Sequence, residues 1–410
     1  MIPTAGPWRG RRSGGTLRRV TTSSAALRPS RRLLLASAAS AGLAGLAPAR
    51  AAASPGRHDP DRAGPFVVGH RGASAYRPEH TVASWALAAR LGADVVEPDL
   101  VSTRDGVLVC RHENEISGTT DVAAHAEFAD RRTTKVVDGL ALTGWFTEDF
   151  TLAELKTLRA VERLPALRQR NTVYDGLWEV PTFEEALDAR EQLSAELGRT
   201  IGIVPEIKHS TYFQGLGLAM ERKVVAALDA RGLNSPHAPA TVQSFELTNL
   251  VHLRRRCGLR APTLFLTSAL GAPPDLVAAG DPRQYADLLR PAALAALAPF
   301  VDRLGPSLDQ VVPRDAAGNL GEPSSLVADA HAAGLSVVPY TLRPENDFLP
   351  LDHRTGTDPA AYGRVLDLAA VYFATGIDGL FTDAPDLGVL ARERYLAGTG
   401  PRATPAEDVA

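Results

Sequence analysis

Short runs of apolar, β-rich sequence alternate with longer helical segments from Phe66 to about residue 395. This alternation is typical of α/β proteins, in which each strand is followed by a helix that packs on the sheet. About eight such units favour a closed (β/α)8 barrel of the TIM type over an open sheet. The predicted strands span residues 66–70, 94–101, 107–111, 201–207, 240–243, 262–267, 301–304 with 309–312, 335–341 and 377–382.

Helices are predicted between these strands, at about 79–91, 182–198, 217–231, 245–257, 324–333 and 360–374. Glycines stand just past several of their ends, at Gly92, Gly232, Gly258, Gly334 and Gly376. Glycine suits the left-handed cap that ends a helix before the next strand. Residues 113–180 break the alternation, being polar and weakly periodic. We interpret them as an insertion after the second strand, at a place where it can cover one side of an active site.

The first 53 residues have the pattern of an export signal. The pair Arg31–Arg32 precedes three leucines and an Ala/Gly/Leu stretch, and small residues follow at 49–53. A charged segment, a short apolar segment and a small-residue cleavage site are typical of secretory signals, and paired arginines indicate the twin-arginine route. Because Arg-Arg pairs also occur earlier in the chain, export is more firmly indicated than its route.

The signal sets the expected domain boundaries and location. Residues 54–64 are predicted to be a linker, 65–395 the barrel domain and 396–410 a flexible tail. We expect the protein in the periplasm, in the cell wall or outside the cell.

Composition excludes several classes of function. A formal net charge of −3 gives no basic field of the kind that binds nucleic acid. No later stretch reaches the roughly 18 uninterrupted apolar residues of a stable membrane span.

With only Cys110 and Cys257, the fold cannot rely on a disulfide framework. We interpret both cysteines as buried small hydrophobic residues, and a single bond between them stays open. The expected partner is a small molecule, and no obligate protein partner is implied.

Polar side chains gather at the carboxyl ends of the predicted strands, where barrel enzymes place their catalytic groups. These candidates are His70, Arg71, Glu97, Asp99, His112, Glu206, Lys208, Gln243 and Tyr340. Other histidines fall on predicted helices or loops and are taken as non-catalytic: His125, His209, His237, His252, His331 and His353. Among these, His209 is the least clear, because it follows Lys208.

Three acids among the candidates indicate a metal site. Glu97 and Asp99 are two residues apart on one strand, so their side chains point the same way. Glu206 ends the neighbouring strand. Like charges held together are costly without a cation. An all-oxygen set suits Ca²⁺ or Mg²⁺ rather than zinc.

Two histidines flank the acids and suit general acid–base work. His70 and His112 can exchange protons near neutral pH, which is what a general base and a general acid require. Arg71 and Lys208 would supply the positive charge that a phosphodiester and its transition state need. Each of these residues alone has a commoner structural explanation, but the whole set at one end of a barrel indicates metal-dependent chemistry on a phosphodiester.

Seven motifs carry a resemblance to a known family: HRGASAYRPEHT (70–81), VEPDL (96–100), LVCRHE (108–113), PEIK (205–208), QSF (243–245), PYTLR (339–343) and GIDGLFTDAPD (376–386). Together they make the chain resemble the glycerophosphodiester phosphodiesterases over essentially the whole barrel. His80, the GLFTD sequence, the insertion and the export signal make it similar to the periplasmic, calcium-using branch of that family. One departure is Glu113, where the family commonly has aspartate after the second histidine.

The resemblance implies a TIM-type barrel that hydrolyses glycerophosphodiesters to sn-glycerol 3-phosphate and an alcohol. It implies one divalent cation, with Ca²⁺ favoured and Mg²⁺ the alternative, bound by Glu97, Asp99 and Glu206. His70 and His112 would be the acid/base pair, with His70 as base and His112 as acid in the first step. Arg71 and Lys208 would contact the phosphate, and the strand-end candidates Gln243 and Tyr340 are expected to bind substrate. We expect the glycerol 2-hydroxyl to be the nucleophile, which would give a cyclic phosphate that water opens.

Two alternatives remain open from the sequence. The same site could serve an exported phosphodiesterase for teichoic acid or a lysophospholipid, and only substrate panels separate these activities. The chain could also be an exported binding protein that has lost turnover. The presence of both histidines and all three acids favours the enzyme.

Overall fold

The computed structural model describes residues 64–398 of the 410-residue chain. The predicted export signal, the linker up to residue 63 and the end of the tail lie outside the described residues.

Parallel strands form the centre of the fold. They are β1 (Phe66–Gly69), β2 (Val95–Val96), β3 (Asp99–Ser102), β7 (Gly202–Ile203), β8 (Glu206–Ile207), β9 (Val242–Ser244), β10 (Thr263–Thr267), β11 (Arg303–Pro306), β12 (Ser336–Val337) and β13 (Gly379–Thr382). β1 pairs with β13 on one side and with β2 on the other. The second run of strands continues from β3 through β8, β9, β10 and β11 to β12.

The strands close into a ring. Beyond β12, the chain reaches β13 through a parallel bridge between Leu342 and Thr382, and Phe381 N donates to Pro339 O at 3.0 Å. Since β2 and β3 belong to one strand position, and β7 and β8 to another, the ring has the strand positions of a (β/α)8 barrel. The predicted fold class is confirmed.

Prolines explain why two predicted strands are divided. Pro98 separates β2 from β3, and Pro205 separates β7 from β8. Proline has no N–H to donate to the ladder, so each strand is interrupted next to a carboxylate of the predicted metal site. Both runs, 94–101 and 201–207, were predicted as unbroken strands.

One predicted strand segment is wrong. Residues 309–312 were paired with the strand at 301–304, but they fall largely on the short helix α10 (Leu308–Val311). Ser307 and Gln310 form a capping box at its start, which favours a helix directly after β11. β4 (Leu108–Cys110) is a strand as predicted, but it runs antiparallel to β3 and lies outside the ring.

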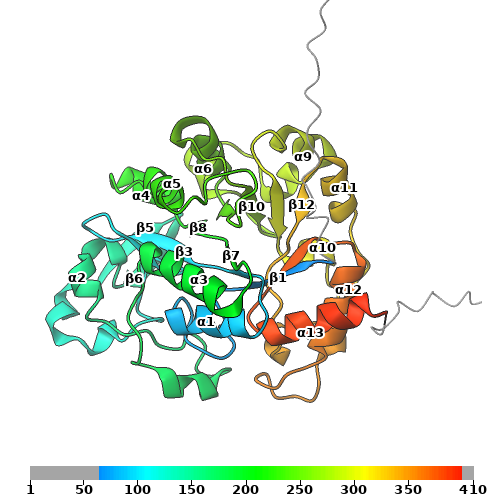
Figure 1. Ribbon diagram of the computed structural model, residues 1–410, viewed down its shortest axis with the longest axis horizontal. Helices are drawn as coiled ribbons and strands as arrows, with labels where there is room; N and C mark the ends of the chain where they lie inside the picture. Colours follow the sequence, from blue (N-terminus) through cyan, green and yellow to red (C-terminus); the bar gives the residue numbers. More distant parts are fainter. Residues whose placement is uncertain (1–63, 399–410) are drawn as a thin grey trace, which may run out of the picture. The chain divides into compact units, whose positions relative to one another are not determined.

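Helices surround the strands (Figure 1). The predicted ones are found at α1 (Val82–Arg90), α3 (Phe183–Leu197), α5 (Glu221–Ala230), α6 (Leu247–His252) with its π-helical continuation η5 (Leu253–Cys257), α11 (Leu326–Ala332) and α12 (Val365–Ala374). Within residues 64–398 the final helix is α13 (Pro385–Leu396). Side-chain caps begin α1 at Thr81 and α3 at Thr182. Gly258, with φ 78°, ends η5 in the left-handed conformation that a side chain would strain.

Two apolar clusters hold the layers together. A small cluster fills the barrel interior and consists of Val68, Val204, Leu264, Leu266, Val338 and Phe381. A much larger cluster lies between the strands and the surrounding helices, where Trp85, Phe183 and Phe373 are almost completely buried. The interior cluster closes the barrel below the carboxyl ends of the strands, so the polar groups there form the floor of a pocket.

The insertion at residues 113–180 contains a hairpin that the sequence pattern did not predict. Its strands are β5 (Thr133–Val137) and β6 (Leu140–Gly144), and short helical turns follow at η3 (Thr147–Asp149), α2 (Leu152–Leu155) and η4 (Gln169–Tyr174). Figure 1 shows β5, β6 and α2 to one side of the barrel strands. Asp138 at the hairpin turn accepts a hydrogen bond of 2.6 Å from His209, which links the insertion to the loop after β8.

Two remaining expectations concern cysteines and membranes. Cys110 and Cys257 are both free thiols. Cys110 is buried as predicted, whereas Cys257 is partly exposed, so the prediction is wrong for Cys257. Within residues 64–398, none of the helices combines the length and the apolar character needed to cross a membrane.

Candidate active site

Three buried carboxylates meet at the carboxyl end of the barrel. Oxygen atoms of Glu97, Asp99 and Glu206 all lie within 4.8 Å of one another, and each residue is at most 3% exposed. Asp99 opens β3 and is the register partner of Glu206, which opens β8, while Glu97 precedes Pro98. The structure therefore brings together the three predicted ligands.

The electrostatics of this acidic triad favour a cation. Burial raises the pKa of Glu97 well above its usual value, and Asp99 and Glu206 raise it further. Burial also raises the pKa of Glu206 to about 7, because the nearby Lys208 offsets only part of the effect. Oδ1 of Asp99 has no hydrogen-bond partner among residues 64–398. A buried all-oxygen set with an unpartnered oxygen can bind a hard divalent cation.

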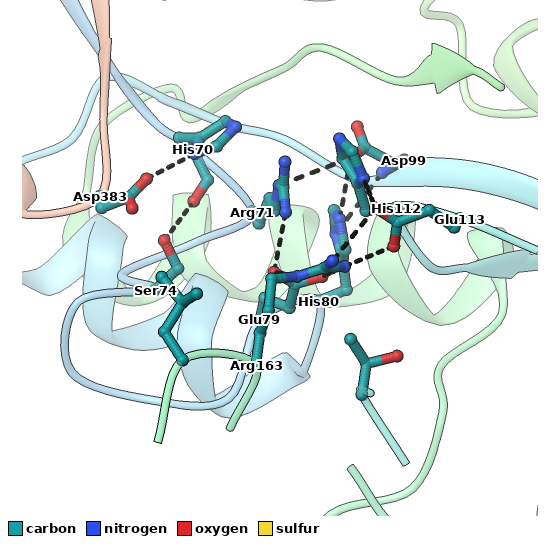
Figure 2. Close-up of polar contacts among 12 residues, drawn as sticks. His70, Arg71, Ser74, Glu79, His80, Asp99, His112, Glu113, Arg163 and Asp383 are labelled. Atoms are coloured by element: carbon teal, nitrogen blue, oxygen red, sulfur yellow. Dashed lines mark hydrogen bonds and ion pairs between the residues drawn. The ribbon is translucent and has the colours of Figure 1, made fainter. Parts of the chain in front are cut away.

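His70 is held by a carboxylate from the opposite end of the chain. Its Nδ1 donates to Oδ1 of Asp383 at 2.5 Å (Figure 2). Burial alone would raise the pKa of Asp383, but Arg168 and Arg343 hold it well below its usual value, so the carboxylate is ionised. This hydrogen bond favours the tautomer whose Nε2 is unprotonated. That atom faces the acidic triad, 3.9 Å from Oε2 of Glu97.

The electrostatics of His70 match a general base. Burial and the neighbouring Arg71 lower the pKa of His70 to about 4. The imidazole is therefore neutral at physiological pH, with a lone pair on Nε2 that can accept a proton.

His112 has a similar partner. Its Nδ1 is hydrogen-bonded to Oε1 of Glu113 (Figure 2). The longer side chain of Glu113 therefore pairs directly with His112. Burial lowers the pKa of His112 well below its usual value, and Arg71 and Lys208 lower it further.

Arg71 and Lys208 place positive charge beside the triad. Nη1 of Arg71 donates to Glu79 at 2.9 Å, while its Nε lies 3.9 Å from Asp99 and has no hydrogen-bond partner among the described residues. Lys208 Nζ lies 2.7 Å from Glu206 and 3.7 Å from Asp99. Lys208 therefore balances the charge of two predicted ligands, in addition to lining the pocket.

Gln243 and Tyr340 were both expected to bind substrate, and the structure places their polar groups in contact with the protein instead. Gln243 is completely buried, and its Nε2 donates to Oε1 of Glu97 at 2.6 Å, so it orients that carboxylate and has no access to a substrate. The Tyr340 hydroxyl donates to the Thr267 carbonyl at 3.0 Å. Its ring lies edge-on to Phe245, and the residue lines the pocket with its hydroxyl already engaged by Thr267.

One pocket collects these groups. It is lined by His70, Arg71, Glu97, His112, Glu206, Lys208, Phe245, Leu266, Tyr340, Thr341, Arg343 and Phe381. All predicted site residues except Asp99 and Gln243 line it directly. Three apolar side chains also line the pocket, those of Phe245, Leu266 and Phe381. The pocket therefore offers charge for a phosphodiester next to an apolar surface.

Several polar residues of the site were not among the site residues predicted from the sequence. Asp383 directly follows β13, so the strand-end criterion could have found it. His80 lies in the loop before α1, where its Nε2 is 3.0 Å from Oδ2 of Asp99. Arg163 and Arg168 belong to the insertion, and no sequence pattern connects them with the barrel.

Comparison with known proteins agrees with this geometry. Residues 70–387 match the model of the Glycerophosphoryl diester phosphodiesterase family. The chain is 36% identical over 331 residues to glycerophosphodiester phosphodiesterase GDPD6 of Arabidopsis thaliana, covering 78% of this chain and 83% of the relative. It is 28% identical over 351 residues to the glycerophosphodiester phosphodiesterase of Haemophilus influenzae, covering 79% and 88%.

The fold has a match among solved structures. A protein from Silicibacter pomeroyi, assigned as a glycerophosphoryl diester phosphodiesterase, aligns with a TM-score of 0.57 and 23% identity, over 85% of this chain and 98% of that chain. This likeness supports the barrel fold alone.

Proposed function

This chain belongs to the glycerophosphoryl diester phosphodiesterase family, and on that premise we propose that it hydrolyses glycerophosphodiesters to sn-glycerol 3-phosphate and an alcohol with the help of a divalent cation. It is a phosphodiesterase, as its curated relatives are named. The observation that carries the proposal is one pocket in which two carboxylate-paired histidines face a buried acidic triad.

The proposed first step forms a cyclic phosphate. Nε2 of His70 takes the proton of the glycerol 2-hydroxyl, and that oxygen attacks phosphorus. The bond between phosphorus and the alcohol oxygen breaks, and His112 gives the leaving oxygen a proton. His112 must be protonated for this role, and the negative charge of a bound phosphodiester opposes the effect of Arg71 and Lys208 on its pKa.

The second step reverses the roles of the histidines. Water attacks the cyclic phosphate while His112 takes its proton. The bond from phosphorus to the glycerol 2-oxygen breaks, and His70 returns the proton to that oxygen. The products are sn-glycerol 3-phosphate and the free alcohol, and both histidines regain their starting protonation states.

The residues present fit a divalent cation. Glu97, Asp99 and Glu206 would hold it, since they are the buried oxygen donors that converge. When bound, such a cation supplies positive charge at the phosphoryl oxygens and a fixed template for the substrate. We propose Ca²⁺, with Mg²⁺ as the alternative, because the motifs resemble those of the calcium-using branch.

Export is part of the proposal. The charged, apolar and small-residue segments within the first 53 residues support it. Fractionation of cells that produce the wild type and a variant with Arg31→Lys and Arg32→Lys tests it. The wild type should leave the cytoplasm and the double variant should accumulate there, whereas equal export of both would exclude the twin-arginine route.

An analogue of glycerophosphocholine without the 2-hydroxyl should be a very poor substrate. Its turnover should fall by about 100-fold or more, because the nucleophile would no longer be part of the bound molecule. Release of choline from both compounds by the wild-type protein is the measurement. Equal rates would show that water attacks phosphorus directly. Binding of the analogue as a competitive inhibitor confirms that it still occupies the pocket.

Arg343 is expected to contact the phosphate. Its Nε donates to Oδ2 of Asp383 at 3.0 Å, and the residue lines the pocket. Arg343→Gln should raise KM for glycerophosphocholine by about 10-fold or more, as expected for loss of a charged hydrogen bond. Arg343→Lys should recover part of the loss. An unchanged KM in Arg343→Gln would remove this residue from substrate binding.

A further inference from the structure

Two arginines of the insertion contact the carboxylates that hold the two histidines. Arg163 binds Glu113, the partner of His112, and Arg168 binds Asp383, the partner of His70. We propose that the insertion positions both catalytic histidines through these two arginines. The roles of the histidines rest on the proposed function, whereas the contacts do not.

A short turn places the two arginines. Around Pro165, Leu167 N and Arg168 N both donate to the Leu164 carbonyl, at 3.0 and 2.8 Å. Glu162 fixes the turn, because its carboxylate accepts from Leu164 N at 2.8 Å and from Asn171 Nδ2 at 2.9 Å. Both arginines therefore lie in one short hydrogen-bonded segment and contact two separate carboxylates.

Arg163 forms a bidentate pair with Glu113. Its Nη1 lies 3.0 Å from Oε1 and its Nη2 lies 2.6 Å from Oε2 of Glu113. The same guanidinium contacts both oxygens of Glu79, at 2.8 and 2.6 Å (Figure 2). Glu79 in turn accepts from Arg71 at 2.9 Å. A planar guanidinium fixes the plane of a carboxylate that it binds in two places, so Arg163 sets the direction in which Glu113 meets His112.

Arg168 reaches His70 in two ways. Its Nη2 lies 2.5 Å from Oδ2 of Asp383, while Oδ1 of the same carboxylate accepts from the imidazole. Its Nη1 donates to the Ser74 carbonyl at 2.9 Å, and the Ser74 hydroxyl donates to the His70 carbonyl at 2.9 Å. The third contact, at 2.7 Å, joins Nε to Glu345. Arg168 therefore fixes both the carboxylate partner and the backbone loop of this histidine.

Burial makes the contacts of Arg168 specific. The side chains of Arg168, Asp383 and Glu345 are at most 5% exposed. Ion pairs that are shielded from water keep a fixed geometry, in contrast to exposed pairs, which are screened and mobile. A lysine in place of either arginine would keep the charge but could not bind both carboxylates in the same plane.

The kinetic test compares Arg163→Lys and Arg168→Lys with Arg170→Lys. Arg170 is exposed and lies two residues after Arg168, so it serves as the matched control. Arg163→Lys and Arg168→Lys should each lower kcat by about 10- to 100-fold and change KM little. This is the effect expected for residues that contact the partner of a catalytic group rather than the substrate. Arg170→Lys should match the wild type. Unchanged kcat in both test variants would overturn the proposal.

Double variants separate the two arms. In a Glu113→Gln background, Arg163→Lys should add little further loss, because both changes act through His112. In an Asp383→Asn background the same substitution should multiply the loss. Equal effects in the two backgrounds would mean that Arg163 acts on the fold in general rather than through His112.

A spectroscopic readout works without turnover. In protein carrying ¹⁵N-labelled histidine, the Nδ1 proton signal of His112 should shift in Arg163→Lys and that of His70 in Arg168→Lys, each leaving the other in place. If these shifts appear in a protein that hydrolyses no glycerophosphodiester, the arginines position the histidines but the proposed function is wrong. If the wild type hydrolyses glycerophosphodiesters and the variants change neither the signals nor kcat, the proposed function holds and the positioning role is wrong. If Arg168→Lys does not fold, the partly exposed Arg163 decides the outcome.

Discussion

Replacement of His70 or His112 by alanine is expected to lower kcat for glycerophosphocholine by about 10²- to 10⁴-fold, the range typical of a positioned general acid or base. Both imidazoles line the pocket, and each has a carboxylate partner at Nδ1, so each presents Nε2 for proton transfer. Neither replacement removes a carboxylate of the acidic triad. The loss should therefore appear in kcat, with binding of the cation preserved.

The control for these variants is His252→Ala, because His252 is exposed at the end of α6. It should keep wild-type activity. Near-wild-type turnover by either single variant, in protein that melts normally, would remove that histidine from the mechanism.

Removal of the divalent cation is expected to abolish turnover, and addition of Ca²⁺ or Mg²⁺ should restore it. Without a cation the acidic triad holds three acidic side chains within 4.8 Å in a buried place, where Lys208 and Arg71 supply nearby positive charge. A cation that binds only the folded protein also stabilises it, by about 2.7 kcal/mol at 100 times the dissociation constant. Melting temperature should therefore rise with added cation in a concentration-dependent way.

Variants of the triad test this account. Asp99→Asn and Glu206→Gln should lose both the thermal shift and the restored activity, whereas Glu127→Gln, which changes an exposed acid, should keep both. A thermal shift that persists in both triad variants would place the cation elsewhere.

Cation affinity should also depend on pH. Burial raises the pKa of Glu206 to about 7 in the cation-free protein, so protons compete with the cation for this carboxylate. Because the ionised form binds the cation, affinity should increase as the pH rises through about 7 and fall below it. Titration calorimetry at pH 6 and pH 8 measures the difference. Equal affinity at the two values would contradict the raised pKa of Glu206.

The strand-end criterion found most of the pocket because a parallel barrel brings the carboxyl ends of its strands to one face. His70, Glu97, Asp99 and Glu206 all follow or interrupt apolar runs, so their convergence could be predicted from the alternating pattern. The ligand set depended further on the two-residue spacing of Glu97 and Asp99, which the structure keeps even though Pro98 divides the strand.

The partners of the histidines could not be predicted in the same way. Arg168 meets Asp383 across 215 residues and comes from a segment without helical or strand periodicity. Such contacts are set by how the insertion packs on the barrel, which local patterns do not encode. The role of Gln243 shows the same limit, because a strand-end position does not tell whether a side chain faces the substrate or, as here, a neighbouring carboxylate.

The central claim is metal-dependent hydrolysis of a glycerophosphodiester, and ³¹P NMR of glycerophosphocholine incubated with the protein lacking its first 53 residues tests it most directly. We expect the diester signal to give way to that of sn-glycerol 3-phosphate, to persist when a chelator is present, and to decline again when Ca²⁺ is added in excess. A diester signal that stays unchanged with folded, cation-bound protein, for this and other glycerophosphodiesters, would contradict the account.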